Sequence, residues 1–118
     1  MKLRYGILST ANVAPRVIDA IRQEGTGEVI AIASREISKA IQFAEEHRIH
    51  KAYGSYEVLF LDSDVDIVYI PTVNQAHFQN AKDALEHGKH VLVEKPFTLK
   101  LSESEKLFQL AKEKKRFI

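Results

Sequence analysis

Apolar residues along the chain alternate between short continuous runs and stripes with helical spacing. The runs are typical of buried strands and fall at Leu3–Leu8, Glu28–Ser34, Val65–Ile70 and His90–Val93, with a shorter candidate at Lys51–Tyr53. The stripes between them follow the i, i+3, i+4 spacing that indicates amphipathic helices. They are Ala14, Val17, Ile18 and Ile21; Ile37, Ala40, Ile41 and Ala44; Phe78, Ala81 and Leu85; and Leu107, Leu110 and Ala111.

Turn and cap residues mark where these elements begin and end. Gly25 ends the first helix, and Ser55 caps a short helix that runs through Leu61. Gly88 suits a left-handed helix C-cap. The segment Ser102–Glu105 has the spacing of a capping box, which places the start of the last helix there. Residues 116–118 resemble the first residues of a sixth strand.

Strands that alternate with helices predict βαβ units and a parallel sheet. The second, fourth and fifth strands are nearly continuously apolar, as strands covered on both faces should be. With right-handed crossovers, the expected fold is α/β, a doubly wound parallel sheet of the Rossmann type. It has five to six strands and helices on both faces. Ligands of such sheets lie beyond the carboxyl ends of the strands, at the switch point between the first and fourth strands.

Composition narrows the possible functions. With 118 residues, 45% of them hydrophobic, the chain is expected to form one globular domain over its whole length, 1–118. A formal net charge of +1 gives no bulk field for nucleic acid or a membrane surface. The absence of cysteine excludes disulfides and thiolate catalysis and fits a cytoplasmic protein. The histidines lack the spacing of a metal site, so no metal is expected.

The loop after the first strand is the first candidate binding segment. It reads Ser9-Thr10-Ala11-Asn12-Val13 and leads into Ala14, an S-x-A-x-x-A pattern where a dinucleotide fingerprint has G-x-G-x-x-G/A. These small residues let the backbone approach a pyrophosphate, and the following helix presents free N–H groups. Thr10 or Asn12 can add a hydrogen bond. An ordinary tight turn would have the same pattern.

Ser34 and Arg35 follow the second strand. Ser34 lies 20 residues beyond Ala14, where an acid would bind the ribose 2′-hydroxyl of NAD and an arginine accommodates the 2′-phosphate of NADP. Lys39, one turn into the next helix, adds positive charge. The sequence therefore favours NADP over NAD as the cofactor. Glu36 is adjacent and keeps NAD open, and a solvated arginine at a helix start is the alternative interpretation.

Polar residues also follow the fourth and fifth strands. Asn74 is a candidate N-cap for the next helix, and His77 falls in its first turn near the switch point. A cap and a surface histidine would explain this segment equally well. After the fifth strand come Glu94 and Lys95, held extended by Pro96. Lys95 is a candidate proton donor at the rim of the crevice, and an exposed Glu–Lys pair is the alternative.

Together these segments resemble the N-terminal domain of the Gfo/Idh/MocA oxidoreductases over essentially the whole chain. The most specific parts are Thr72–His77 and Gly88–Pro96, similar to the family's T-P-N-x-x-H and G-K-H-V-x-x-E-K-P patterns. Tyr5–Ala11 with Ser34-Arg35 resembles the branch that includes dihydrodiol dehydrogenases and NADP-linked sugar oxidoreductases. The chain departs from the family where Ser9 and Ala11 replace fingerprint glycines and Val73 replaces a proline.

The resemblance implies hydride transfer between a nicotinamide and a carbon that bears a hydroxyl or carbonyl group. It places the pyrophosphate on residues 9–13 and the adenosine ribose or its phosphate on Ser34 and Arg35. It assigns Thr72, Asn74 and His77 to the cofactor crevice and Glu94 to the nicotinamide ribose. Lys95 would contact both cofactor and substrate and take part in proton transfer.

Members of this family continue into a second domain that supplies the substrate pocket, and this chain ends at Ile118. The expectation is therefore a domain of a longer, homo-oligomeric enzyme that acts on a small molecule. Alone, it should bind nucleotide without turnover and associate with itself through its uncovered sheet edge. A non-catalytic nucleotide-binding sensor on the same fold is the alternative. Receivers and methyltransferases are disfavoured because the acids they need are missing after the first and second strands.

Overall fold

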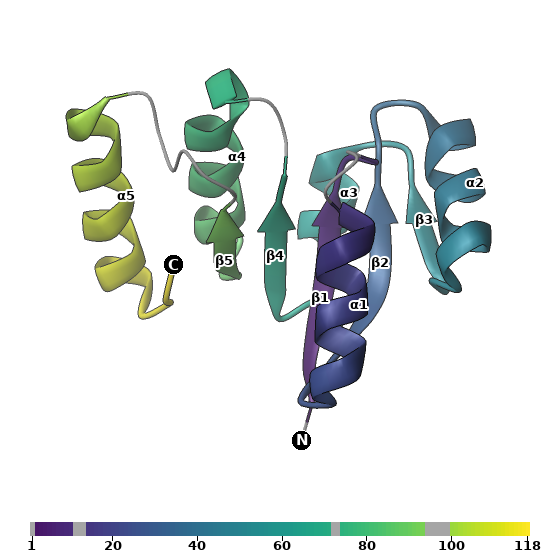
Figure 1. Ribbon diagram of the computed structural model, residues 1–118. Coiled ribbons are helices and arrows are strands. Elements are labelled where there is room, and N and C mark those ends of the chain that lie inside the picture. The colour runs from purple at the N-terminus through teal and green to yellow at the C-terminus, as the bar shows by residue number, and fades with distance from the viewer. Residues whose placement is uncertain (1, 11–13, 72–73, 94–99) are drawn as a thin grey trace.

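The computed structural model describes residues 2–10, 14–71, 74–93 and 100–118. Strands and helices alternate along these residues, as the sequence predicts (Figure 1). In chain order they are β1 (Leu3–Leu8), α1 (Ala14–Glu24), β2 (Gly27–Ala33), α2 (Ile37–His47), β3 (Lys51–Tyr53), α3 (Tyr56–Phe60), β4 (Ile67–Ile70), α4 (Asn74–Glu86), β5 (His90–Val93) and α5 (Leu101–Lys114). Within the described residues, no helix is long and apolar enough to span a membrane.

The five strands form one parallel sheet in the order β3-β2-β1-β4-β5. The chain moves outward from β1 to β3 and then returns to the other side of β1 as β4, so the direction reverses between β1 and β4. The register pairs Leu8 with Ala33, Ile7 with Tyr69 and Ile70 with Val93. The carboxyl ends of β1, β2, β4 and β5 therefore lie at one edge of the sheet (Figure 1). This confirms the predicted doubly wound fold and its switch point.

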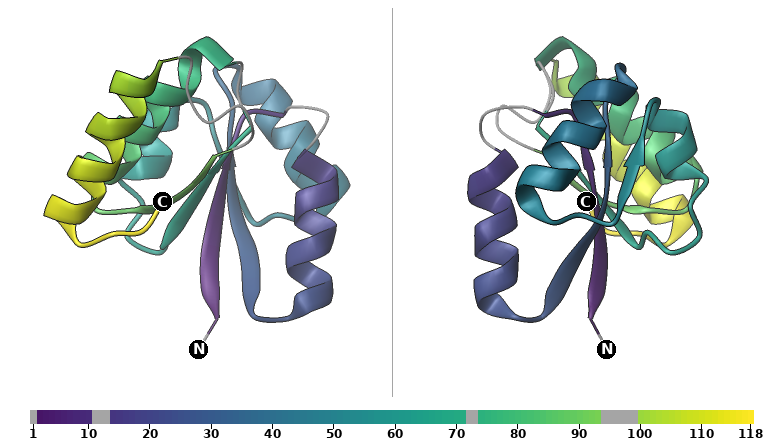
Figure 2. Two further views of the ribbon diagram at one scale, coloured as in Figure 1. Left: turned by 60° about the vertical axis from the view of Figure 1, so that its left-hand side comes forward. Right: turned by 90° about the vertical axis from the view of Figure 1, so that its right-hand side faces the viewer.

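Helices cover both faces of the sheet, with α1 and α2 on one side and α3, α4 and α5 on the other (Figure 2). Neighbouring residues of a strand point to opposite faces, so Ile7 and Leu8 belong to different cores. The core under α1 and α2 includes Ile7, Ile18, Ile32, Phe43 and Tyr69. The core under the other helices includes Leu8, Leu59, Val68, Leu85, Val91 and Leu107. Each such side chain contributes about 1.5–3 kcal/mol through burial.

Gly6 in β1 allows a close approach between the sheet and α3. A β-carbon at this position would lie 2.8 Å from Cδ2 of Leu59 and 3.1 Å from Cγ1 of Val65. Both contacts are shorter than atoms can comfortably make in a packed core. The absence of a side chain at Gly6 therefore sets how tightly α3 packs against the sheet.

The predicted apolar stripe of α2 is partly wrong. The helix buries Ala40, Phe43 and Ala44, whereas Ile37 and Ile41 are 48% and 46% exposed. The helix lies toward the β3 end of the sheet, and β3 has only three residues (Figure 1). Its outer side therefore has little sheet beneath it, and two small alanines with one phenylalanine make the contact.

Two expectations about the last quarter of the chain are also corrected. The N-cap of α5 is Lys100, without a side-chain cap bond, so Ser102 lies inside the first turn and no capping box starts the helix there. The backbone amides of Glu103 and Ser104 donate to the Lys100 carbonyl. Residues 116–118 are not a strand among the described residues, although the Val91 amide donates to the Phe117 carbonyl at 3.1 Å. That bond places the segment along the outer edge of β5.

Candidate functional site

In the turn after β1, Ser9 has a backbone conformation that is typical of glycine. Ser9 has a φ of 76°, in the left-handed region that costs a residue with a β-carbon about 1–2 kcal/mol. Its amide donates to the carbonyl of Ala33 at 2.7 Å, which ties the end of β1 to the end of β2. Although Ser9 replaces the first glycine of the fingerprint, the turn therefore keeps the backbone conformation that a glycine would adopt there. Because the Ser9 amide is occupied, pyrophosphate binding would fall to later amides of the loop.

Folding brings together two of the predicted site residues, Thr10 and Lys39. They line a hollow of about 170 Å³ between the loop after β1 and helix α2, together with Gln42, Phe43 and Glu46. Whole ligand pockets commonly measure about 300–1,000 Å³, so this hollow can hold only part of a nucleotide. The Lys39 ammonium lies 3.7 Å from the Glu36 carboxylate, and both side chains are mostly exposed.

Ser34 is buried and hydrogen-bonded to neighbouring backbone, whereas Arg35 is exposed. Ser34 is buried; its amide donates to the Tyr53 carbonyl at 3.0 Å, and its hydroxyl oxygen accepts from the Glu36 amide at 3.3 Å. The hydroxyl donates no hydrogen bond to another described residue. Arg35 is exposed and forms no hydrogen bond or ion pair with another described residue. The Arg35 guanidinium, just beyond the carboxyl end of β2, is therefore exposed to solvent.

His77 is not the surface histidine that one interpretation expected. It is 1% exposed, in the first turn of α4 at the carboxyl end of β4, and Asn80 one turn further is 8% exposed. Asn74 is the first residue of α4, which places it inside the helix and not before it as an N-cap. The burial of His77 could not be deduced from spacing, since it depends on how α4 is rotated against the sheet.

The remaining candidates lie outside the described residues, and their roles stay predictions. They are Ala11, Asn12, Val13, Thr72, Glu94 and Lys95. The described residues on either side of them nevertheless lie at one edge. The chain leaves the sheet after Leu8, Ile70 and Val93, which the strand register holds next to one another.

At the opposite edge of the sheet lies a buried lysine that sequence reasoning did not single out. Lys89 is 7% exposed, and its ammonium donates to the carbonyls of Asp62 and Val65 at 2.7 Å each. Burial lowers the pKa of Lys89. These bonds fix the turn that leads into β4, far from the strand ends that carry the candidate site. The sequence signal that could have identified Lys89 is its position directly before a buried strand, and this position indicates a structural role.

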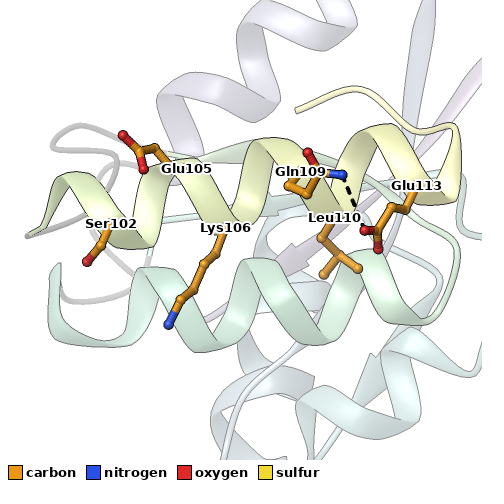
Figure 3. A pocket seen from close by; sticks show the side chains of 6 residues that line it. All are labelled: Ser102, Glu105, Lys106, Gln109, Leu110 and Glu113. Atoms are coloured by element: carbon orange, nitrogen blue, oxygen red, sulfur yellow. Dashed lines mark hydrogen bonds between the residues drawn. The ribbon is translucent and has the colours of Figure 1, made fainter.

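A larger hollow, of about 520 Å³, lies along α5, and Figure 3 shows the side chains that line it. Its lining residues are Ser102, Glu105, Lys106, Gln109, Leu110 and Glu113. All of them belong to one helix, and Gln109 donates to Glu113 at 3.3 Å. No predicted site residue lines this hollow, and no second element contributes converging groups. We therefore place the candidate site at the strand ends. Among the described residues, no cluster of His, Asp and Glu side chains could hold a metal.

Comparison with known proteins identifies the family of the chain. A family model described as an oxidoreductase family with an NAD-binding Rossmann fold matches residues 3–118. The chain is 40% identical over 106 residues to D-xylose 1-dehydrogenase (NADP(+)) 2 from Haloferax volcanii, covering 90% of the chain and 33% of that protein. It is 34% identical over 120 residues to trans-1,2-dihydrobenzene-1,2-diol dehydrogenase from Danio rerio, covering 100% of the chain and 36% of that protein.

The fold matches a solved structure of KijD10, a 3-ketoreductase from Actinomadura kijaniata in complex with TDP-benzene and NADP. The TM-score is 0.91 at 36% identity, and the match covers 98% of the chain and 37% of KijD10. The chain thus spans about a third of the length of the proteins it matches.

Proposed function

Because the chain belongs to the Gfo/Idh/MocA family of oxidoreductases, with its NAD-binding Rossmann fold, we propose that it binds a nicotinamide nucleotide across the carboxyl ends of β1, β2 and β4 and prefers NADP. The observation that carries this proposal is that Thr10 and Lys39 line one hollow, while Arg35 just after β2 is exposed. The loop after β1 and the end of β2 are the two places where such folds hold the pyrophosphate and the adenosine ribose.

The preference for NADP is supported by charge at the end of β2. Arg35 offers a planar set of donors that suits a phosphate, and Lys39 adds a second cation one turn away. Ser34 takes the place where NAD-specific domains carry an acid, and its hydroxyl donates to no other described residue, so it can donate to a phosphate. The relatives from Haloferax volcanii and Actinomadura kijaniata are named with NADP, which agrees with this arrangement.

The other candidates follow from the family resemblance. The loop of residues 9–13 would hold the pyrophosphate through amides other than that of Ser9, which donates to Ala33. Thr72, Asn74 and His77 would line the crevice beside the nicotinamide. Glu94 would bind the nicotinamide ribose, and Lys95 would hold a proton at the reacting oxygen of the substrate. When bound, the nicotinamide supplies or accepts the hydride.

Because the chain spans about a third of the length of its relatives, we propose that the activity belongs to a longer protein that carries this domain. Such a protein would oxidise or reduce a hydroxyl or carbonyl group of a sugar-like small molecule, in line with the relatives' names. The groups that choose the substrate would lie in the part of the relatives that this chain does not match. The 118-residue chain is expected to bind nucleotide without turnover. Lys95→Ala in the longer protein separates an enzyme from a sensor, because turnover should be lost while nucleotide binding is kept.

The direct test is a fluorescence titration of the chain with NADPH and NADH. We expect NADPH to bind more tightly, and Arg35→Ala or Lys39→Ala to weaken NADPH binding about tenfold each while NADH binding hardly changes. Lys112→Ala is the matched control, because it removes the same charge from the exposed last turn of α5. Equal binding of both nucleotides would contradict the role of Arg35 and Lys39. Absence of binding would contradict the proposed function as a whole.

A further inference from the structure

Glu36 places a negative charge inside the cationic end of β2. Its carboxylate lies 3.7 Å from the Lys39 ammonium, and the two side chains are 64% and 61% exposed. The pair is solvent-facing, so it adds little to stability. Its importance is that Lys39 has a carboxylate partner before any ligand arrives.

The backbone holds Glu36 in this position. The Glu36 amide donates to the Ser34 hydroxyl oxygen at 3.3 Å, and the Glu36 carbonyl accepts from the amides of Lys39 and Ala40. Glu36 is the N-cap residue of α2, in an extended conformation, but its side chain makes no capping hydrogen bond. The carboxylate is therefore not used to cap the helix, and it points its charge toward Lys39.

A 2′-phosphate that approaches Arg35 and Lys39 would meet this carboxylate in two ways. It must displace Glu36 from Lys39, and it then carries its own negative charge close to an unpaired carboxylate. A ribose without the phosphate meets neither penalty. The two effects act on the same ligand group and in the same direction.

We propose that Glu36 is a specificity-determining residue that competes with the nucleotide 2′-phosphate for Lys39. It thereby lowers the affinity for NADP relative to the affinity for NAD. The proposal rests on the proposed function, because it concerns the same end of β2. Glu36 does not bind the nicotinamide or the substrate. It acts on the phosphate through Lys39 and through its own charge.

The test compares Glu36→Gln with Glu45→Gln in the NADPH and NADH titration. Both residues are exposed on or at the start of α2, and each substitution removes one negative charge. They lie nine positions apart, which is about 13 Å along a helix. We expect Glu36→Gln to tighten NADPH binding about two- to fivefold and to leave NADH binding unchanged, an effect of the size expected for an exposed charge. Glu45→Gln should change neither, and added salt should shrink the Glu36 effect.

A second variant tests whether Lys39 carries the effect. In a Lys39→Ala background, Glu36→Gln should tighten NADPH binding less than it does in the parent chain. If the parent chain prefers NADPH and Glu36→Gln behaves like Glu45→Gln, the role of Glu36 is wrong while the proposed function stands. If the parent chain binds neither nucleotide, both proposals fail together.

Discussion

Ser9→Gly is expected to stabilise the fold, because the turn after β1 already has a conformation that suits glycine. The φ of 76° costs serine about 1–2 kcal/mol. Glycine would avoid that cost and lose about 0.5–1 kcal/mol through the greater freedom of its unfolded chain. The net expectation is about 0.5–1 kcal/mol of added stability. For a domain of this size, that corresponds to a rise of about 2–4 °C in the unfolding midpoint.

Gly25→Ser is the reverse substitution at almost the same backbone angle. Gly25 has a φ of 78°, and a β-carbon added there would meet nothing within 4 Å. Any loss of stability therefore reports the backbone conformation and not a steric clash. We expect a fall of about 2–4 °C, similar in size and opposite in sign to the effect of Ser9→Gly.

Thermal unfolding followed by circular dichroism measures both variants under one set of conditions. If Gly25→Ser lowers the midpoint while Ser9→Gly leaves it unchanged or lowers it, then the Ser9 side chain makes a stabilising contact that outweighs its backbone cost. The argument from φ at Ser9 would then be refuted. If neither variant moves the midpoint, a positive φ carries no measurable cost in this fold.

Two further predictions concern packing and pH. Gly6→Ala should destabilise the fold by about 1 kcal/mol, since the new methyl group would lie 2.8 Å from the buried Leu59 side chain. Urea unfolding measures this loss of stability, and an unchanged unfolding midpoint would contradict the packing argument. Burial and the nearby Arg116 lower the pKa of His90 below 6.5, and its ring nitrogen accepts the Phe117 amide at 3.1 Å. Because the folded state favours neutral His90, its contribution to stability is complete above pH 6.5 and is lost as the pH falls below that value. In His90→Gln, the free energy of unfolding should therefore depend less on pH below 6.5.

The sequence pattern predicts the order and kind of every described element, because buried strands and amphipathic helices leave different periodicities. It predicts less well which side of a helix meets the sheet. Ile37 and Ile41 fit the stripe of α2, yet Phe43 makes the contact, because the helix lies over a short edge strand. The helical spacing of apolar residues determines which residues share a side of the helix. Packing against the sheet determines which side is buried.

The location of the candidate site follows from topology, whereas its side-chain environment does not. Parallel strands that alternate with helices bring their carboxyl ends to one edge, so the sequence places Thr10, Arg35 and His77 at that edge. It does not indicate that His77 is buried or that Glu36 pairs with Lys39. Those features depend on helix rotation and side-chain contact, which appear only once the elements are packed.

The proposed binding mode also separates two kinds of effect on nucleotide binding. In this proposal the loop that starts at Ser9 would lie against the pyrophosphate, which NAD and NADP share, whereas Arg35 and Lys39 would lie against the 2′-phosphate by which the two differ. A change in the turn should therefore alter both affinities by the same factor and leave their ratio fixed. A change in charge at the end of β2 should alter the ratio through NADPH alone. The two single variants and the double variant Ser9→Gly/Arg35→Ala, measured with both nucleotides, test whether the two halves of the site act independently, because the free-energy changes of independent contacts add.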